Sequence, residues 1–233
     1  MTQQASIGLV NQDRFPGWWR VYLQRRYAVR FYSLILTIVV APILKVIGLH
    51  AHLIQLFLGL NLLVSSLPLE SRKWRWVLPA IVLVAIGLRI ASLRAGHVGL
   101  STLSLWLWTA IGLYAVFMAL RFALRSSIIT SEHLYAALSA YLLAGVFMGV
   151  LYWSLDQVWP DSIVVNGTGA SGPFLPMEGV YFSFITLATV GYGDMVPGND
   201  VVRNFAIMEA IAGQFYLAVM IARLMSLYMR EAR

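Results

Sequence analysis

Six consecutive residues in the C-terminal part of the chain combine two hydroxyls, two glycines and a carboxylate. They are Thr189, Val190, Gly191, Tyr192, Gly193 and Asp194 (the TVGYGD segment). A potassium ion stripped of water needs several oxygen ligands, and a row of backbone carbonyls supplies them when successive carbonyls point the same way. Such a row requires backbone angles that most residues avoid and glycine adopts readily. The segment therefore predicts an ion-binding backbone, and the alternative is a glycine turn without a function.

An apolar stretch, 176–188, comes directly before the TVGYGD segment and is too short to span a bilayer. Pro176 suits the first turn of a helix, where its missing N–H does no harm, and Glu178 lies near the positive end of that helix. Irregular backbone at membrane depth is tolerated only where it is buried in protein or lines water. We therefore expect a short re-entrant helix that ends at the TVGYGD segment, preceded by an exposed loop over 156–172.

The composition of the chain is that of an integral membrane protein. Of its 233 residues, 60% are hydrophobic and 12% are charged, which is about half the charge of a typical soluble domain. The absence of cysteine excludes disulfides, thiolate metal sites and cysteine nucleophiles. The formal net charge is +7, but the basic residues lie between apolar stretches, so they are expected to set membrane topology rather than to bind nucleic acid.

Six stretches are long and apolar enough to be transmembrane helices. They are 31–49, 53–69, 76–93, 100–120, 133–155 and 201–229. The predicted fold is an all-α membrane protein with six transmembrane helices and a re-entrant helix between the fifth and the sixth. Basic loops alternate with loops that carry little charge, so both termini are expected to face the cytoplasm. The N-terminal region, 1–30, is expected to hold an interfacial helix over 15–27, or else a loosely ordered tail.

The TVGYGD segment and its surroundings resemble the potassium channel family. Its first five residues are identical to the selectivity filter of that family, and an outer helix, exposed loop, pore helix, filter and inner helix follow in the family's order. The resemblance covers the pore domain, 131–233. The K⁺ ligands that it implies are Thr189, Val190, Gly191 and Tyr192, with Gly193 completing the filter. One chain carries one copy of the filter, so the resemblance implies a homotetramer in the plasma membrane, with K⁺ as the permeant ion and no cofactor.

In many members of that family the acid after the filter bonds to an aromatic residue of the pore helix. Here the acid is Asp194, and Tyr181 stands where the family often has Trp. Two interpretations of Tyr181 remain open at this point: a hydrogen bond to Asp194 that supports the filter, or simple packing at the membrane interface.

The sixth predicted helix carries four residues that we assign to the cavity or to gating. Gly213 stands where related channels have a hinge glycine, and the alternative is a glycine for close helix packing. Gln214 and Leu217 are expected to face a water-filled cavity if the family's register holds. Glu209 is an acid inside an apolar span, and such acids are usually functional or paired. It could tune the cavity potential, or pair with Arg203 or a neighbouring subunit, and we prefer pairing.

The first four predicted helices, within 31–130, occupy the place of a voltage sensor in six-helix channels. A voltage sensor needs several arginines along its fourth helix, and 100–120 contains none. The sequence therefore predicts a potassium-selective channel subunit with little voltage dependence. The alternatives are a weakly selective cation channel and a potassium transporter subunit. An enzyme is not expected, because His-Glu-x-x-His and Gly-x-Ser-x-Gly motifs are missing.

Overall fold

Each long apolar stretch that the structure describes is helical, because a helix satisfies its backbone polar groups within one segment. The computed structural model describes residues 25–46, 77–95, 98–125, 131–165 and 174–231. The helices are α2 (Arg26–Val46), α4 (Val77–Ala95), α5 (Val98–Arg125), α6 (Ser131–Val158), α7 (Pro176–Leu187) and α8 (Asp200–Glu231), and the strands are β1 (Ile163–Val165) and β2 (Met195–Pro197).

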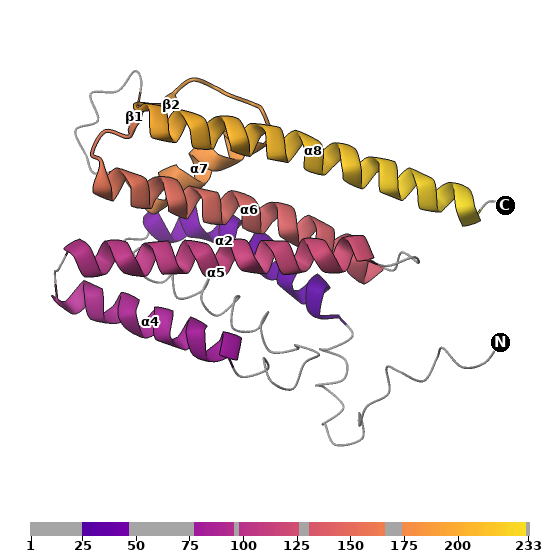
Figure 1. Cartoon of the computed structure of the whole chain (residues 1–233), viewed down its shortest axis with the longest axis horizontal. Helices are drawn as coiled ribbons and strands as arrows, with labels where there is room; N and C mark the ends of the chain where they lie inside the picture. The colour runs from indigo at the N-terminus through magenta and orange to yellow at the C-terminus, as the bar shows by residue number, and fades with distance from the viewer. Residues whose placement is uncertain (1–24, 47–76, 96–97, 126–130, 166–173, 232–233) are drawn as a thin grey trace.

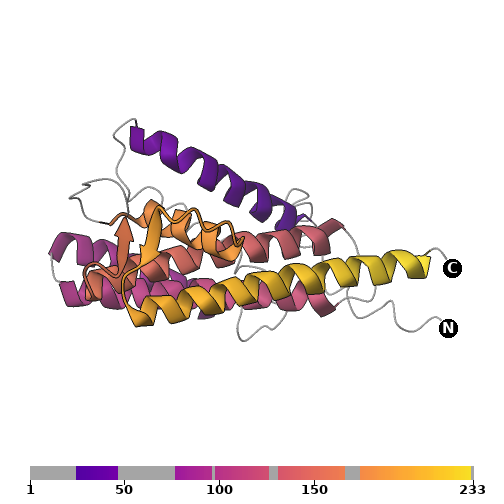
Figure 2. The same cartoon turned by 90° about the horizontal axis from the view of Figure 1, so that it is seen from above.

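Helices α4, α5, α6 and α8 run along the long axis of the molecule (Figure 1). Helix α5 contacts both α4 and α6, and α2 also packs on α6, inclined to it when seen from above (Figure 2). One hydrophobic core joins α2, α4, α5 and α6, with Leu34, Val82, Leu105 and Phe147 all buried. A second core joins α6, α7 and α8. Helix α7 is therefore held against the long helices that precede and follow it in the chain.

Three of the described helices are long and apolar enough to cross a membrane: Thr102–Leu124 within α5, Ser131–Val158, and Asp200–Arg223 within α8. Helices over 76–93, 100–120, 133–155 and 201–229 were predicted, and α4, α5, α6 and α8 occupy those places. The predicted helix over 53–69 and most of the predicted interfacial helix over 15–27 lie outside the described residues.

The first described helix begins earlier in the chain than the first predicted transmembrane stretch. It was expected over 31–49, whereas α2 runs over Arg26–Val46, so the predicted region boundary at residue 30 falls inside a helix. Its first turn places a basic side chain, that of Arg26, against two aromatic rings. The Arg26 guanidinium lies 5.0 Å from the ring centroid of Tyr27 and 5.4 Å from that of Phe122, and a cation over an aromatic face is attracted to it.

The stretch between α6 and α7 is not a loop throughout. Helix α6 continues to Val158, and β1 then pairs with β2 in antiparallel register, with Val164 opposite Val196. The described structure is mostly helical, as an all-α fold predicts, but the expectation of a plain loop over 156–172 is corrected by strand β1. The pairing has a consequence for the site, because β2 follows the TVGYGD segment. After α6 the chain forms β1, α7 and the TVGYGD segment. Strand β2 then returns it to the end of the molecule at which α6 ends (Figure 1).

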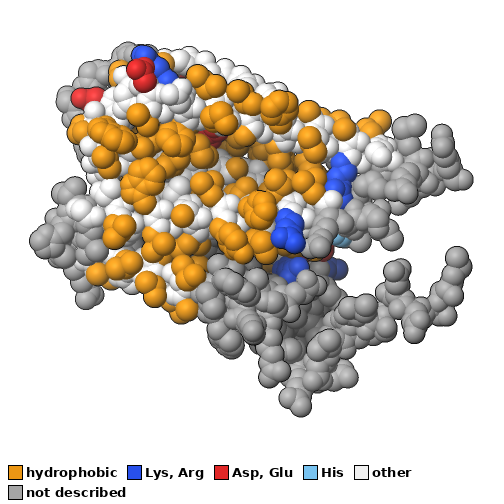
Figure 3. Space-filling view, viewed as in Figure 1, with side chains coloured by type: hydrophobic (Ala, Val, Ile, Leu, Met, Phe, Trp, Pro, Cys, Tyr) orange, Lys and Arg blue, Asp and Glu red, His pale blue; other side chains and the backbone are white. Residues whose placement is uncertain are grey.

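Helix α8 is covered far less than α6. Within the apolar stretch of α6, 61% of the residues are buried, whereas 11% are buried within the apolar stretch of α8. Hydrophobic side chains spread over the face shown in Figure 3, while Lys and Arg gather toward the end at which α8 terminates. A smaller group of charges lies where α8 begins. This distribution, apolar in the middle and charged at the ends, is typical of a membrane-embedded bundle.

Candidate functional site at the end of helix α7

Helix α7 begins as its sequence predicts. Pro176 occupies the first turn after the N-cap residue Leu175. The Glu178 carboxylate accepts a hydrogen bond from the Leu175 backbone N–H, with 2.7 Å between Oε2 and N. This bond satisfies one of the donors near the helix start, and the negative charge lies at the positive end of the helix dipole.

Two facing glycines bring α7 close to α6. A Cβ placed on Gly149 would lie 2.6 Å from the backbone N of Val180, and one placed on Gly179 would collide with the Gly149 carbonyl oxygen. The two helix backbones therefore touch, and any larger side chain at either position would push α7 outward. This contact fixes the distance between α7 and α6.

The last turn of α7 accepts the N–H groups of the residues that follow it. The N–H of Thr189 donates to the Thr186 carbonyl oxygen at 2.9 Å, and those of Val190 and Gly191 donate to the Ile185 carbonyl oxygen at 2.8 and 3.1 Å. All peptide bonds in the described residues are trans, and in a planar trans peptide the N–H and the preceding carbonyl point in opposite directions. The carbonyls of three successive residues, 188–190, therefore point away from α7.

The backbone angles explain how successive carbonyls share one direction. Thr189, Gly191 and Gly193 have φ of 55°, 56° and 79°, and the residues between them do not have positive φ. Glycine adopts the left-handed region without steric cost, whereas threonine rarely enters it. The strain at Thr189 is held in place by the bonds of the turn around it, as is common at functional sites. The two glycines thus serve the conformation that their spacing predicted.

Tyr181 and Asp194 come together beside the TVGYGD segment. The Tyr181 hydroxyl donates to the Asp194 carboxylate, with 2.7 Å between the two oxygens. Of the two interpretations that the sequence left open, the hydrogen bond is the one found here. This bond raises the pKa of Tyr181 to about 12, so the hydroxyl stays protonated and remains a donor at neutral pH. Whether it supports the filter in a working channel stays a prediction.

Helix α8 reaches the TVGYGD segment through Gln214. Its side-chain amide donates to the Thr189 hydroxyl, with 3.2 Å between Nε2 and Oγ1. Gln214 and Leu217 are both exposed in the single chain, and residues three apart share a helix face. Their assignment to a water-filled cavity stays a prediction, and the bond to Thr189 adds a partner for Gln214 that the sequence did not indicate.

Gly213 packs directly against the C-terminal end of α7. It is buried, and a Cβ placed there would collide with the Leu187 carbonyl oxygen. Helix α8 is continuous over Asp200–Glu231, so no break marks this position. The geometry supports the close-packing interpretation of Gly213, and the hinge stays a prediction.

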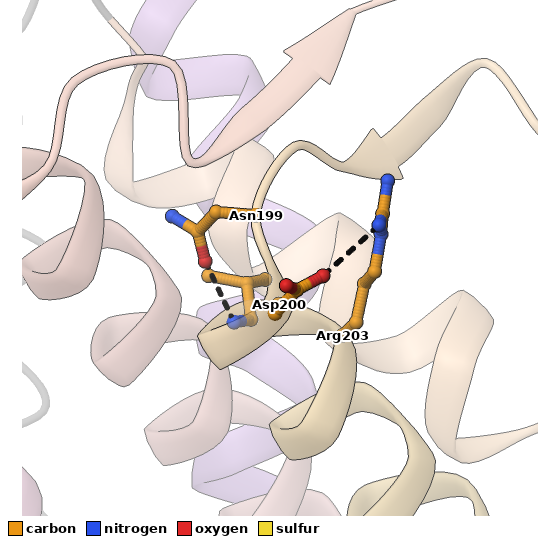
Figure 4. Close-up of polar contacts among 4 residues, drawn as sticks. Asn199, Asp200 and Arg203 are labelled. Carbon is orange, nitrogen blue, oxygen red and sulfur yellow. Dashed lines mark hydrogen bonds and ion pairs between the residues drawn. The ribbon is translucent and has the colours of Figure 1, made fainter.

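Glu209 is paired, but not with the residue that the sequence suggested. Arg203 instead contacts Asp200, with 3.0 Å between Nη1 and Oδ1 (Figure 4), in the first turn of α8, where Asn199 Oδ1 caps the Val202 N–H at 2.9 Å. The spacing explains the choice, because residues three apart on a helix are neighbours. Arg203 as the partner of Glu209 is therefore wrong.

The partners of Glu209 come from α6 and α7. Its carboxyl accepts hydrogen bonds from the Tyr152 hydroxyl at 2.7 Å and from the Ser183 hydroxyl at 2.5 Å. Neither hydroxyl was singled out from the sequence, because each is an isolated polar group in an apolar helix. The signal that could have found them is Glu209 itself, since an acid inside a span requires partners.

The segment that contains this site is similar to sequences of known ion channels. Residues 128–230 match the ion channel family model. The chain is 33% identical over 92 residues to two-pore potassium channel 3 of Arabidopsis thaliana, a match that covers 40% of this chain and 18% of the relative. It is 29% identical over 87 residues to two pore potassium channel c of Oryza sativa subsp. japonica, covering 37% of this chain and 18% of the relative.

These matches concern one segment and not the whole chain. The ion channel match runs from just before α6 through most of α8, and the matched part spans less than a fifth of each plant relative. No solved structure matches the chain. Together with the apolar helices, the matches support a membrane protein of the potassium channel type. Within the described part of the chain, no cluster of three or more His, Asp or Glu side chains could hold a metal ion.

Proposed function

We propose that this chain is one subunit of a homotetrameric channel that conducts K⁺ selectively and passively across a membrane. The observation that carries the proposal is the direction of the backbone around Thr189. Three successive N–H groups donate into the last turn of α7, so the carbonyls of 188–190 point away from that helix. A row of carbonyls is what replaces the water shell of K⁺ in a selectivity filter. In the assembled channel, the carbonyls of Val190, Gly191 and Tyr192, with the carbonyl and hydroxyl of Thr189, would hold the ion.

The residues that one chain leaves uncovered support the proposed fourfold assembly. One TVGYGD segment faces an ion from one side only, so several copies are needed to surround it. Val190 and Tyr192 are 50% and 71% exposed in the single chain, and in a tetramer they would pack against neighbouring subunits. The large uncovered surface of α8 supports the same arrangement. The negative ends of four α7 helices would then point toward the ion and favour a cation there.

The finer features of membrane placement belong to this proposal as well. We propose six transmembrane helices, a re-entrant α7, both termini in the cytoplasm, and a plasma-membrane location. The gathering of Lys and Arg near the end at which α8 terminates supports a cytoplasmic C-terminus (Figure 3), because cytoplasmic ends carry the basic residues. We also propose that the pore is not strongly voltage-gated, since the arginines of α5, Arg121 and Arg125, lie in its last turns.

Ion flux into liposomes tests the proposal. The purified protein is reconstituted, loaded with K⁺, and assayed with Na⁺ as the competing ion. We expect K⁺ flux to exceed Na⁺ flux by a wide margin, since a site that replaces the full water shell discriminates strongly between ions. Equal flux of the two ions would favour the weakly selective cation channel. Flux that needs a second ion or a proton gradient would favour a transporter, and either result would overturn the proposal.

A further inference from the structure

A polar cluster lies buried between the three helices that build the candidate site. Glu209 of α8 is 3% exposed, and Tyr152 of α6 and Ser183 of α7 are 0% exposed. One oxygen of the Glu209 carboxyl accepts a bond from Tyr152 and the other from Ser183. The Glu209 carboxyl group therefore links α8 to α6 through Tyr152 and to α7 through Ser183.

The surroundings of this cluster are apolar, so the bonds are costly to lose. Leu155, Phe182, Ile185 and Val202 are buried in the core beside it, and the Tyr152 ring packs edge-on to that of Phe182 with 4.9 Å between centroids. A polar group in such a place that loses its partner pays the full penalty of desolvation. The three groups therefore hold one another in a defined geometry, which plain hydrophobic packing specifies less strictly.

The cluster lies directly behind the anchor of the TVGYGD segment. Ser183 stands two residues before Ile185, whose carbonyl receives the N–H groups of Val190 and Gly191. Glu209 stands one turn before Gly213, which packs against the Leu187 carbonyl. A shift of α7 relative to α8 would thus strain the cluster and move the carbonyl row together.

We propose that Glu209 is a positioning residue for ion selection. Through Ser183 and Tyr152 it fixes α7 against α8 and α6, and so it fixes the carbonyls that α7 anchors. The action depends on its two accepted hydrogen bonds. This proposal rests on the proposed channel function, and the assay for that function is the starting point of its test.

The test compares four variants by the K⁺/Na⁺ permeability ratio, measured from reversal potentials. Ser183→Ala, Tyr152→Phe and Glu209→Leu each remove a bond of the cluster. We expect Ser183→Ala and Glu209→Leu to lower the ratio roughly tenfold, the effect of leaving a buried polar group unpaired or of removing both ties to α7 and α6. Tyr152→Phe is expected to lower it less, because it leaves the bond to α7 in place. Glu209→Gln can still accept one hydrogen bond through its carbonyl oxygen and can donate the other from its NH₂ group. Its permeability ratio should therefore stay within about twofold of that of the parent.

A matched control separates positioning from general stability. The Tyr216 hydroxyl of α8 donates to the Ala137 carbonyl of α6 at 2.5 Å, so Tyr216→Phe removes a bond between two of the same helices without touching α7. This variant is expected to lower the thermal midpoint while leaving the permeability ratio within about twofold. If Glu209→Leu does not assemble, Ser183→Ala alone decides, because it deletes only a hydroxyl.

The results of this test distinguish a failure of the channel function from a failure of the positioning role. If the parent shows no K⁺ selectivity, the channel function itself fails. If the parent is selective and both Ser183→Ala and Glu209→Leu keep its ratio, the positioning role is overturned while the channel stands. If Glu209→Gln loses as much selectivity as Glu209→Leu, the charge of the carboxyl rather than its bonds is what matters, and the proposal is again overturned. Effects of Ser183→Ala that vanish in a Glu209→Leu background would show that the two residues act as one unit.

Discussion

Replacing Gly191 by alanine probes the conformation on which ion selection depends. Gly191 has φ of 56°, a region in which a residue with a Cβ loses about 1–2 kcal/mol. Within the single chain a Cβ at Gly191 would meet nothing within 4 Å, so the penalty is conformational rather than a collision. It acts in every subunit at once, and in a tetramer it amounts to about 4–8 kcal/mol against the conducting backbone.

That penalty corresponds to a large shift in a conformational equilibrium. At 1.4 kcal/mol per factor of ten, it shifts the balance between the conducting and a relaxed backbone by roughly three to six orders of magnitude. We therefore expect Gly191→Ala to abolish K⁺ flux in the liposome assay or to abolish the preference for K⁺ over Na⁺. The measurement is flux per tetramer, with assembly checked by size-exclusion chromatography.

Gly87→Ala is the matched control for this substitution. Gly87 lies in α4, its φ is not in the left-handed region, and a Cβ there also meets nothing within 4 Å. Alanine in a helix is favoured over glycine by about 1 kcal/mol, so this variant should assemble and conduct like the parent. Normal K⁺ flux and selectivity in Gly191→Ala would refute the argument, because the carbonyl row would then not depend on a left-handed residue at this position.

Two further substitutions, and the voltage dependence of the parent, have defined expected outcomes. Gly213→Ala forces a Cβ against the Leu187 carbonyl and should lower stability by about 1–3 kcal/mol, seen as a lower thermal midpoint; an unchanged midpoint with a lower open probability would instead indicate a hinge. Tyr181→Phe removes the bond to Asp194 and should reduce the time over which K⁺ flux is sustained in the liposome assay. In the parent this bond is fully present below pH 10 and is lost as pH rises through about 12, the raised pKa of Tyr181, so flux that fades between pH 7 and 9 would contradict it. The current–voltage relation should be shallow, because a charge crossing 100 mV supplies about 2.3 kcal/mol and α5 carries arginine only in its last turns; a steep activation curve would contradict that.

Features set by local chemistry were predictable from the sequence. The start of α7 at Pro176 follows from the ring that fixes its backbone and from the carboxylate of Glu178 two residues later. The left-handed residues at Gly191 and Gly193 follow from glycine alone. The long helices follow from apolar stretches that exceed the bilayer thickness. In each case the signal and the structure lie within a few residues of one another.

Features set by distant partners were not predictable in the same way. Glu209 indicated that it needs a partner, but Tyr152 lies 57 residues away and Ser183 lies 26 residues away, and only the packing of three helices selects them. The same holds for β1 and β2, whose three-residue strands are too short to carry an alternating pattern. Thr189 is a further case, because threonine by itself argues against a left-handed backbone, and the turn around it decides.

The uncovered faces of α8 give the strongest physical argument for assembly. Most of its buried or partly buried residues follow one stripe, spaced by three and four residues, from Val202 through Glu209 to Arg223, and the part of this stripe up to Tyr216 faces α6 and α7. The remaining faces are also apolar, with Met208 and Phe215 more than half exposed, and a helix that is apolar all round is normally covered all round. Lipid alone does not suit every face, because Gln214 lies among the exposed residues and a polar amide is costly in hydrocarbon. The proposed fourfold pore would satisfy both conditions, because it would place Gln214 toward water and cover the other faces of α8 with neighbouring subunits.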